Sequence, residues 1–528
     1  MRRQGVFAIT IAALALTACG INPVTGKREV QFISESQELQ IGEQQYAPTR
    51  QSEGGDLTVL PELTAYVSEV GQKLAAMADR KLPYEFAVLN SSVPNAWALP
   101  GGKIAVNRGL LTELTSEAEL AAVLGHEIVH AAARHGAKAQ ERATMMQAGL
   151  QVAQIGAAVG GVDANLAGLV LQGAGLGAQL IQTKYGREQE LEADKYGMKY
   201  MKGAGYDPWG AVTLQETFVR LSNQGEQKRD WLGGLFASHP PSQERVDENR
   251  KTTEQLGRGG DIGAELYASR VKPLIDMKPA YEKNDAAMVA ARKGDLAQAK
   301  SLARDAARLL PQEGRFPQML GEIALSEKKF QEAVGHYQQA IQLNPNYFGS
   351  YLGGGVAQYR AGDKAKAEQW LTQSAKLLPT APAAYFLGHL AREKGDTQSA
   401  VKYYQAAASS RSDIGQAAAS ELARLDLPQN PGNYIATGAQ LAANGRLILA
   451  VENRAPLPVT DVKVTPVLVD TAGNVVGLAA SVTITQTIKP GDRLAVDAGV
   501  GAMSQQQLAG VRFKVDSARI VDTAPIRY

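Results

Sequence analysis

The sequence predicts a multidomain protein in which an α+β domain, an all-α repeat domain and a small all-β sandwich follow one another. A chain of 528 residues is too long for a single hydrophobic core. Helical and alternating patterns mix in the first half, a 34-residue period follows, and short alternating runs separated by turns fill the remainder. The 45% hydrophobic and 20% charged content is typical of folded protein. A net charge of +2 without basic runs indicates no nucleic-acid partner.

The N-terminal residues predict export. Arg2 and Arg3 precede an apolar stretch over 6–16, which is too short to span a membrane, and small residues then lead to Cys19. The order LTAC resembles the bacterial lipobox, which implies a signal peptide over 1–18 and lipidation of Cys19. A plain signal peptide is the alternative. Cys19 is the only cysteine in the sequence, so an internal disulfide is excluded.

The residue after the cysteine indicates the destination. In bacteria with two membranes, Gly20 rather than aspartate at this position implies delivery to the outer membrane. We therefore expect a periplasmic cell-envelope protein whose lipid sits in the inner leaflet of the outer membrane. Residues 19–55 are expected to form a tether and an N-terminal helix.

The α+β domain is expected over residues 56–255. Spacing and alternation predict helices from Ser34 and over 60–77, a strand over 84–90, and two strands joined by a Pro-Gly-Gly turn within 96–111. Thr115 or Ser116 is expected to cap the next helix, with Glu119 as the capping-box partner of Ser116.

A stretch rich in glycine and alanine interrupts this domain at residues 143–183. Asp163 is its only charged residue, so a membrane-inserting hairpin is conceivable. Glutamines, among them Gln147, Gln151, Gln154, Gln172 and Gln179, break the apolar pieces, which favours two small-residue helices packed closely on the protein.

A repeat region is expected over 280–425, after a linker over 256–279. Its period is set by Pro311, Pro345 and Pro379, since 345 − 311 and 379 − 345 both equal 34. Three further columns keep this period: Gly294, Lys328 and Gly362; Ala299, Ala333 and Ala367; Ala306, Ala340 and Ser374. A fourth copy, shifted by one residue, begins at Gly395. This 34-residue period, with small residues where paired helices touch and a proline that closes each unit, resembles the tetratricopeptide repeat. Such repeats stack into a short solenoid.

The composition changes again from Gly432 onward. Runs such as RLILAVENR and SVTITQTIK alternate or are β-branched, and TAGN and KPGD turns separate them. We expect a small all-β domain over 430–528, most simply a sandwich. It carries no recognisable chemistry.

The sequence HEIVH, beginning at His126, predicts a metal site. On a helix, His126 and His130 lie one turn apart on one face, so both imidazoles can bind one ion. Glu127 is rotated by about 100° from His126, which lets its carboxylate reach a metal-bound water. Zinc, one ion per chain, suits such a site, and Glu127 would act as the general base. Chance occurrence of the pattern is of the order of 0.003, so structural histidines are a poor alternative.

A carboxylate from a second helix is the expected third ligand. His135 does not fit the pattern HExxHxxGxxH, because that pattern needs the histidine one position later, at Gly136. Glu190 and Asp194 lie one turn apart, so one can bind zinc while the other orients a histidine. Spacing alone leaves open the pair Glu188 and Glu192, or a solvated acidic face.

The motifs NAWALPGGKIAVNRGLL, HEIVHAAARH and EADKYG, in this order, resemble the HtpX- and CAAX-prenyl-protease-type zinc metallopeptidase family. The resemblance implies a zincin-type metalloprotease domain in which Glu190 is the third ligand and Asp194 supports it. With an export signal and tetratricopeptide repeats, the chain is most similar to the BepA-like periplasmic branch. The family usually has Ser-Arg before the third motif, whereas this chain has Gly186-Arg187. A role for that serine is therefore not carried over to this chain.

A His-Pro pair after the third motif matches that branch, which implies that His239 lies near the metal. His239 is then a fourth ligand that blocks water, a donor to the oxyanion, or a turn residue before Pro240. Substrate is expected to add to an exposed edge strand formed by Lys103, Ile104, Ala105 and Val106.

These observations predict a zinc endopeptidase of the cell envelope that hydrolyses misfolded or misassembled exported proteins. The repeats would recruit clients or an outer-membrane assembly machinery. The alternative is a chaperone or scaffold that uses the repeats, with the zinc site gated or residual. Prenyl-protein processing within a membrane is disfavoured, because no uninterrupted spanning helices flank the site.

Overall fold

The computed structural model describes residues 19–142, 185–223, 233–470 and 474–521. The expected signal peptide and the glycine- and alanine-rich stretch 143–183 lie outside the described residues. The chain divides into two compact units, Met1–Ala357 and Gln358–Tyr528. Within the described ranges, no helix combines the length and apolar character needed to cross a membrane.

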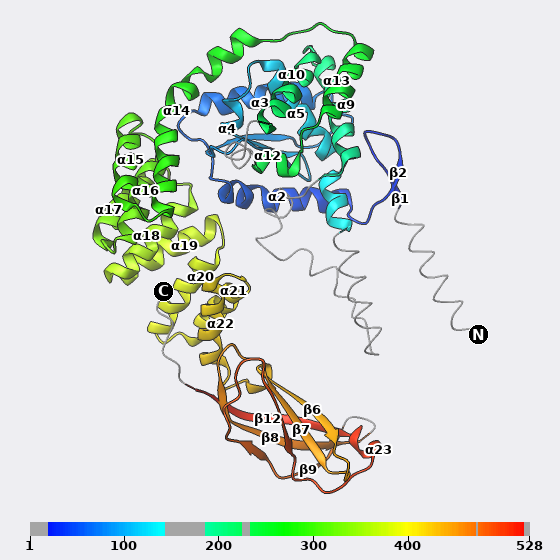
Figure 1. Cartoon of the computed structure of the whole chain (residues 1–528), viewed down its shortest axis with the longest axis vertical. Helices are drawn as coiled ribbons and strands as arrows, with labels where there is room; N and C mark the ends of the chain where they lie inside the picture. The colour runs from blue at the N-terminus through cyan, green and yellow to red at the C-terminus, as the bar shows by residue number, and fades with distance from the viewer. Residues whose placement is uncertain (1–18, 143–184, 224–232, 471–473, 522–528) are drawn as a thin grey trace, which may run out of the picture. The chain divides into compact units, whose positions relative to one another are not determined.

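A three-stranded sheet forms the centre of the first unit (Figure 1). β5 (Lys103–Asn107) lies in the middle, parallel to β3 (Glu85–Leu89) and antiparallel to β4 (Ala96–Leu99). Gly101 and Gly102 join β4 to β5 with positive φ values of 80° and 84°, which glycine adopts without strain. The strand–turn–strand predicted from the sequence is therefore confirmed, as is the strand before it.

Helices cover both faces of this sheet because successive strand side chains point to opposite faces. α2 (Glu35–Ser52) covers one face, and α3 (Pro61–Ala75) and α5 (Glu117–Ala132) cover the other (Figure 1). The face toward α2 carries the odd-numbered side chains Ala87, Leu89, Trp97, Leu99 and Ala105. The face toward α3 and α5 carries the even-numbered side chains Phe86, Val88, Ala96, Ala98, Ile104 and Val106.

The start of α5 is fixed by a hydrogen-bonded cap. The Ser116 hydroxyl accepts a hydrogen bond from the backbone N–H of Glu119, as predicted. The Glu119 carboxylate reaches back one residue further than expected and accepts from the N–H and hydroxyl of Thr115. Both candidate capping residues therefore help to define where α5 begins.

The backbones of α5 and α9 (Arg187–Gly203) approach each other at two glycines. A Cβ added at Gly125 would stand 3.1 Å from the carbonyl oxygen of Gly197. A Cβ added at Gly197 would stand 3.0 Å from the carbonyl carbon of Gly125. Neither position has room for a side chain, so the two helices lie as close as their backbones allow.

The remaining elements around the three-stranded sheet frame this helix pair. Near the N-terminus, β1 (Cys19–Ile21) pairs with β2 (Arg28–Val30). Helices α4 (Arg108–Leu111), α10 (Trp209–Ser222), α12 (Gly233–Ser238) and α13 (Gln243–Leu256) complete the region. Among them, α10 packs on α5 and α13, and α13 packs on α9.

The stretch expected to be a linker, 256–279, is helical from Ala264 onward. It opens α14 (Ala264–Arg292), a helix that contains two prolines, which obscure its pattern in the sequence. Tyr267 and Leu274 are buried in the core around the sheet, and the Tyr267 hydroxyl donates to the carbonyl of Leu111. This part of the chain is therefore packed against the core around the sheet.

Buried polar contacts join the first repeat to the part of the chain around the sheet. The Tyr281 hydroxyl and the Asn90 amide both donate to the Glu313 carboxylate, at 2.6 and 3.0 Å. The Arg108 guanidinium lies over the Tyr281 ring, 3.5 Å from its centroid. These buried side chains hydrogen-bond or stack with one another and not with water. The contact is therefore specific in its geometry.

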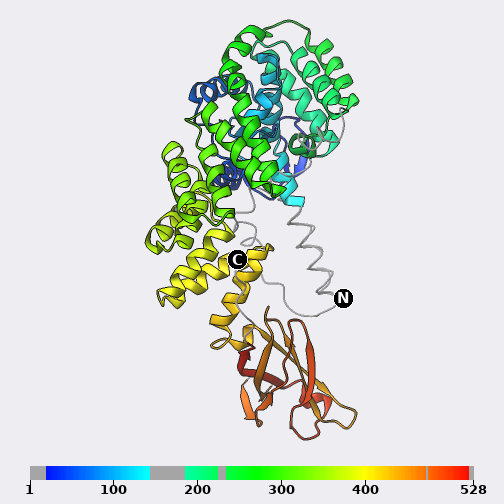
Figure 2. The ribbon, with the colours of Figure 1, turned by 60° about the vertical axis from the view of Figure 1, so that its left-hand side comes forward.

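The repeat region consists of antiparallel helices, and α14–α17 stack side by side in the first unit (Figure 2). Its helices are α15 (Leu296–Leu309), α16 (Arg315–Ser326), α17 (Phe330–Leu343), α18 (Phe348–Ala361), α19 (Lys364–Leu377), α20 (Ala381–Glu393), α21 (Thr397–Ala408) and α22 (Asp413–Asp426). The predicted columns of small residues, from Ala299 and from Ala306, are fully inaccessible to solvent.

The predicted column that begins at Gly294 lies in the turns between helices. Gly294, Lys328 and Gly362 have φ values of 83°, 60° and 94°. This left-handed backbone favours glycine, so the lysine occupies a strained position in an otherwise regular repeat. The repeat prediction is confirmed.

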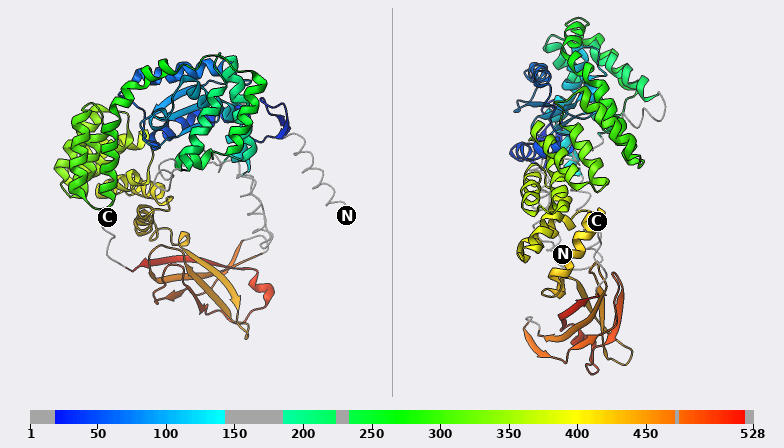
Figure 3. Two further views of the ribbon diagram at one scale, coloured as in Figure 1. Left: turned by 45° about the horizontal axis from the view of Figure 1, so that its top comes forward. Right: turned by 90° about the vertical axis from the view of Figure 1, so that its left-hand side faces the viewer.

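The C-terminal part of the second unit contains two sheets that share one core (Figure 3). One sheet has the order β11-β7-β6, and the other has β10-β8-β12 with β9 beside β8. The strands are β6 (Ile435–Leu441), β7 (Leu447–Asn453), β8 (Val459–Val469), β9 (Val475–Leu478), β10 (Val482–Ile484), β11 (Arg493–Asp497) and β12 (Val511–Ile520). A short 3-10 turn, η1 (Pro431–Asn433), precedes them, and α23 (Gln505–Leu508) lies before β12. The predicted all-β sandwich is confirmed.

Substitution of Gly197 by alanine tests the close helix contact. We expect Gly197→Ala to lower the free energy of unfolding by about 1–3 kcal/mol, because the new Cβ forces α9 away from α5. Gly335→Ala in α17 is the control, since nothing lies within 4 Å of its added Cβ. That variant should be neutral or more stable by up to ~1 kcal/mol. Denaturant unfolding measures both, and equal effects of the two variants would contradict the packing argument.

Candidate metal centre

Three side chains from α5 and α9 converge on one point. The Nε2 atoms of His126 and His130 lie 2.9 Å apart, and each lies 3.5 Å from a carboxylate oxygen of Glu190. All three residues are buried. His126 and His130 occupy successive turns of α5, and Glu190 reaches them from the facing turn of α9, as the spacing and the family resemblance suggested.

His239 is the fourth member of this cluster. Its Nδ1 lies 3.2 Å from His126 Nε2 and 3.1 Å from Glu190 Oε1, and the ring is buried. Donor atoms of His126, His130, Glu190 and His239 all lie within 4.8 Å of one another. The segment after α12 therefore brings a third imidazole to the same point.

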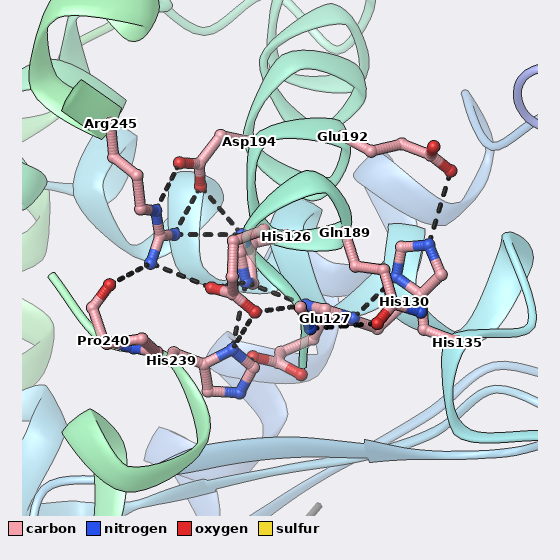
Figure 4. A network of polar contacts seen from close by, with 12 residues as sticks. His126, Glu127, His130, His135, Gln189, Glu192, Asp194, His239, Pro240 and Arg245 are labelled. Carbon is pink, nitrogen blue, oxygen red and sulfur yellow. Dashed lines mark hydrogen bonds and ion pairs between the residues drawn. The ribbon is translucent and has the colours of Figure 1, made fainter. Parts of the chain in front are cut away.

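Asp194 holds the second nitrogen of His126. Its Oδ1 lies 2.8 Å from His126 Nδ1, so this nitrogen carries the proton and Nε2 is left free as a ligand atom (Figure 4). Arg245 of α13 binds both oxygens of Asp194, at 2.7 Å each, and also lies 2.9 Å from Glu190. This geometry matches the supporting position implied for Asp194.

Glu127 lies beside the cluster rather than in it. Its Oε1 is 3.6 Å from His239 Nε2. Its Oε2 is buried and has no hydrogen-bond partner. A buried carboxylate oxygen without a partner is costly, and a water molecule bound at the centre would satisfy it.

The carboxylates make this centre favour positive charge. Burial disfavours the charged form of His126, but Glu190 and Asp194 outweigh burial and raise its pKa to about 10. Burial opposes ionisation of Glu190 too, yet the neighbouring imidazoles of His239 and His126 hold its pKa well below the usual value. Burial raises the pKa of Glu127 and lowers that of His130.

These residues fit a resident metal ion. Two imidazole nitrogens at 2.9 Å cannot both present lone pairs to each other unless a cation or a proton lies between them. Two or three imidazoles with one carboxylate form the donor set that divalent transition metals prefer. His126, His130 and Glu190 would hold the ion, with His239 within reach.

Two contributors at the site, Arg245 and Tyr185, were missed in the sequence, and His135 was considered only as a possible third ligand. Arg245 follows His239 by six residues, but nothing in the local pattern links it to Asp194. Tyr185 stacks on the His130 ring, with centroids 3.9 Å apart and planes 26° apart. His135 Nδ1 lies 2.9 Å from His130 Nδ1, a contact that a histidine five residues along a regular helix would not make.

The edge-strand prediction is wrong. Lys103, Ile104, Ala105 and Val106 belong to β5, which is hydrogen-bonded on both sides and buried along its whole length. The sequence contains no signal for strand order. In the structure β3 pairs with the edge of β5 that β4 leaves free, so β5 lies in the middle of the sheet. A substrate strand has no free backbone edge to pair with on β5.

A sheet with flanking helices and a helix-borne HExxH pair, completed by a glutamate from a second helix, defines a metallopeptidase. Residues 61–253 match the sequence model of peptidase family M48. The chain belongs to peptidase family M48, which confirms the resemblance drawn from its three motifs. Residues 284–348, 319–382 and 381–414 match tetratricopeptide repeat models.

Several curated proteins are similar to part of this chain. The putative beta-barrel assembly-enhancing protease of Vibrio cholerae is 30% identical over 197 residues, 37% of this chain and 40% of the relative. The beta-barrel assembly-enhancing protease of Escherichia coli is 26% identical over 236 residues, 44% of this chain and 47% of the relative. Metalloprotease YcaL of Escherichia coli is 31% identical over 189 residues, 35% of this chain and 70% of the relative. The chain thus spans less than half the length of the first two.

Removal of the Arg245 charge tests the buried ion pairs. We expect Arg245→Met to lower the free energy of unfolding of the metal-free protein by about 3–5 kcal/mol, because two buried carboxylates lose their cation. Arg250→Met is the control in the same helix, since the exposed Arg250 pairs only at the surface and should cost less than about 1 kcal/mol. Unfolding in urea compares them, and a fully stable Arg245→Met protein would refute this assignment.

Proposed function

We propose that this chain is a zinc-dependent endopeptidase of the bacterial cell envelope that hydrolyses misfolded or misassembled exported proteins. The observation that carries the proposal is the convergence of His126, His130 and Glu190, with Glu127 beside them. Zinc suits these ligands, and when bound it lowers the pKa of water and polarises the scissile carbonyl.

The side chains around the centre supply the remaining chemistry. Glu127 accepts a proton from the attacking water and passes it to the leaving amine, and its raised pKa suits a group that must both accept and donate. Asp194 fixes the tautomer of His126, and Arg245 keeps Asp194 ionised and in place. The reaction is the hydrolysis of a peptide bond, with water adding to the carbonyl carbon and the amine leaving.

β4, rather than β5, is the strand proposed to bind substrate. Among the described strands, β4 pairs only with β5, so its other edge is not occupied by a strand. The four residues of β4 are buried, so substrate pairing there requires the groups that cover this edge to move aside. Ala96 at its start lines the same cavity as His126 and Glu127. The outer edge of β3 is less suited to bind a substrate peptide, because the Leu57 N–H already donates to the Val88 carbonyl there. Backbone pairing with β4 would hold an extended peptide across the centre.

His239 is proposed to close the centre in the resting state. Its Nδ1 lies close to both His126 and Glu190, where a fourth protein ligand would leave no position for water. The alternative is that His239 moves outward and donates to the oxyanion. A closed centre also supports the second candidate function, a chaperone or scaffold that works through its repeats.

Location and partners follow from the remaining parts of the sequence. Lipidation of Cys19 would anchor the protein in the inner leaflet of the outer membrane. The names of the Vibrio and Escherichia relatives associate those proteins with β-barrel assembly. We propose that the repeats of this chain bind clients or an outer-membrane assembly machinery, since stacked tetratricopeptide repeats form surfaces that bind other proteins.

Replacement of the base separates catalysis from metal binding. We expect Glu127→Gln to keep its zinc and to lose peptidase activity by ~10²–10⁴-fold, because the amide cannot accept a proton. Glu188→Gln, on the exposed side of α9, serves as the matched control and should retain both. Cleavage of casein and metal analysis provide the measurements. Normal cleavage by Glu127→Gln would remove Glu127 from the mechanism, and full rescue of a deletion strain by it would favour the scaffold.

Replacement of His239 distinguishes closure from catalysis. If His239 closes the centre, His239→Ala should cleave casein faster than the wild type while binding zinc with three protein ligands. A fall of ~10²–10³-fold in turnover would instead assign His239 to the oxyanion. Peptidase rates of both proteins, measured at equal zinc content, give the answer.

A further inference from the structure

A chain of buried polar contacts leads away from His130 on the side opposite the metal centre. His135 Nδ1 lies 2.9 Å from His130 Nδ1, and His135 Nε2 lies 3.3 Å from Glu192 Oε1. His135 is 1% exposed. Figure 4 shows Glu192 and Asp194 leaving the same helix in different directions, toward His135 and toward His126. The family resemblance assigned no role to His135 or Glu192.

The donors and acceptors along this chain can be ordered in only one way when His130 binds a metal. Its Nε2 faces the other ligands and must be unprotonated, so its Nδ1 carries the hydrogen and donates to His135 Nδ1. A neutral imidazole has one donor and one acceptor, so His135 then carries its hydrogen on Nε2. That hydrogen is donated to the Glu192 carboxylate.

We propose that His135 and Glu192 are positioning residues that fix the tautomer and ring orientation of His130. The arrangement mirrors the one at His126, where Asp194 receives the Nδ1 hydrogen directly. Glu192 contacts His135, and His135 contacts His130, so the extra imidazole connects the carboxylate on α9 to the metal-binding histidine. One helix, α9, thus supplies the carboxylate ligand and the carboxylates that orient both histidines. This inference rests on the proposed metal site.

The N-terminal turn holds the far end of the chain. Asn22 is fully buried, and its Nδ2 donates to Glu192 Oε1 at 3.3 Å. Its Oδ1 accepts from the backbone N–H groups of Val24 and Thr25, so the turn itself sets the direction of the amide. Asn22 therefore restrains the Glu192 carboxylate, which is only partly buried, in the position that receives the His135 hydrogen.

Backbone geometry brings His135 to this place. On a continuous helix, a residue five positions after His130 would be rotated by about 140° from it. α5 ends at Ala132, and Arg134 takes a left-handed conformation with φ of 63°. Glu38 accepts a hydrogen bond from the Arg134 side chain at 2.7 Å, which holds this turn in place. The reversal directs the His135 ring back toward His130.

Two substitutions at position 135 separate hydrogen bonding from shape. In His135→Phe the ring remains but both polar contacts are lost, and we expect the zinc dissociation constant to rise by about 10–100-fold. In His135→Gln the amide oxygen can accept from His130 while its N–H donates to Glu192, so most of the affinity should return. Asn22→Ala should weaken zinc binding by less than His135→Phe does.

Competition with a chelator measures zinc affinity, and thermal unfolding of the metal-free proteins shows whether folding is affected. His336→Phe in the repeats is the matched control and should bind zinc as the wild type does. Unchanged affinity in His135→Phe, or equal losses in His135→Phe and His135→Gln, would overturn the proposed relay. A wild-type protein that binds zinc but cleaves no protein would refute the proposed peptidase and leave this inference standing.

Discussion

The close approach of two helix backbones at Gly125 and Gly197 is the constraint on which the metal centre depends. α5 carries the histidines and the base, and α9 carries the carboxylates. The reach of a glutamate side chain is short, so Glu190 meets His126 and His130 only if the two helices lie in backbone contact. A Cβ at either glycine would lie only 3.0–3.1 Å from the facing backbone, so larger side chains would push apart two helices that carry ligands of one ion.

Burial of so many charged groups at one place is expensive unless they compensate one another. Glu127, Glu190 and Asp194 are all buried near the centre, and Arg245 is the cation that neutralises two of them. Glu190 and Asp194 outweigh burial and raise the pKa of His126 in the metal-free protein, whereas burial lowers the pKa of His130. The negative charge of these carboxylates also attracts a metal ion. The buried charges that lower the stability of the metal-free protein therefore raise its affinity for the metal.

The two regions of the chain use different rules to specify their structure. In the repeats, alanines and one left-handed turn position recur with each unit, so the information is local and repeated. In the metallopeptidase region, contacts such as Asn22 with Glu192 join residues that lie far apart in the sequence. The candidate metal centre lies in the metallopeptidase region, where each such contact occurs once.

The sequence by itself determined the parts that depend on short periods. Helical spacing put His126 and His130 on one face, alternation defined the strands, and the 34-residue period identified the buried columns of the repeats. Strand order, the Arg245 clamp and the path from His130 through His135 to Glu192 were decided only by the tertiary structure. The physical reason is range: a period reports which way neighbouring side chains point, whereas pairing partners are chosen by packing among distant segments. β5 shows the difference, because the Pro-Gly-Gly turn before it predicts a strand from the sequence, whereas its place in the middle of the sheet is not predicted.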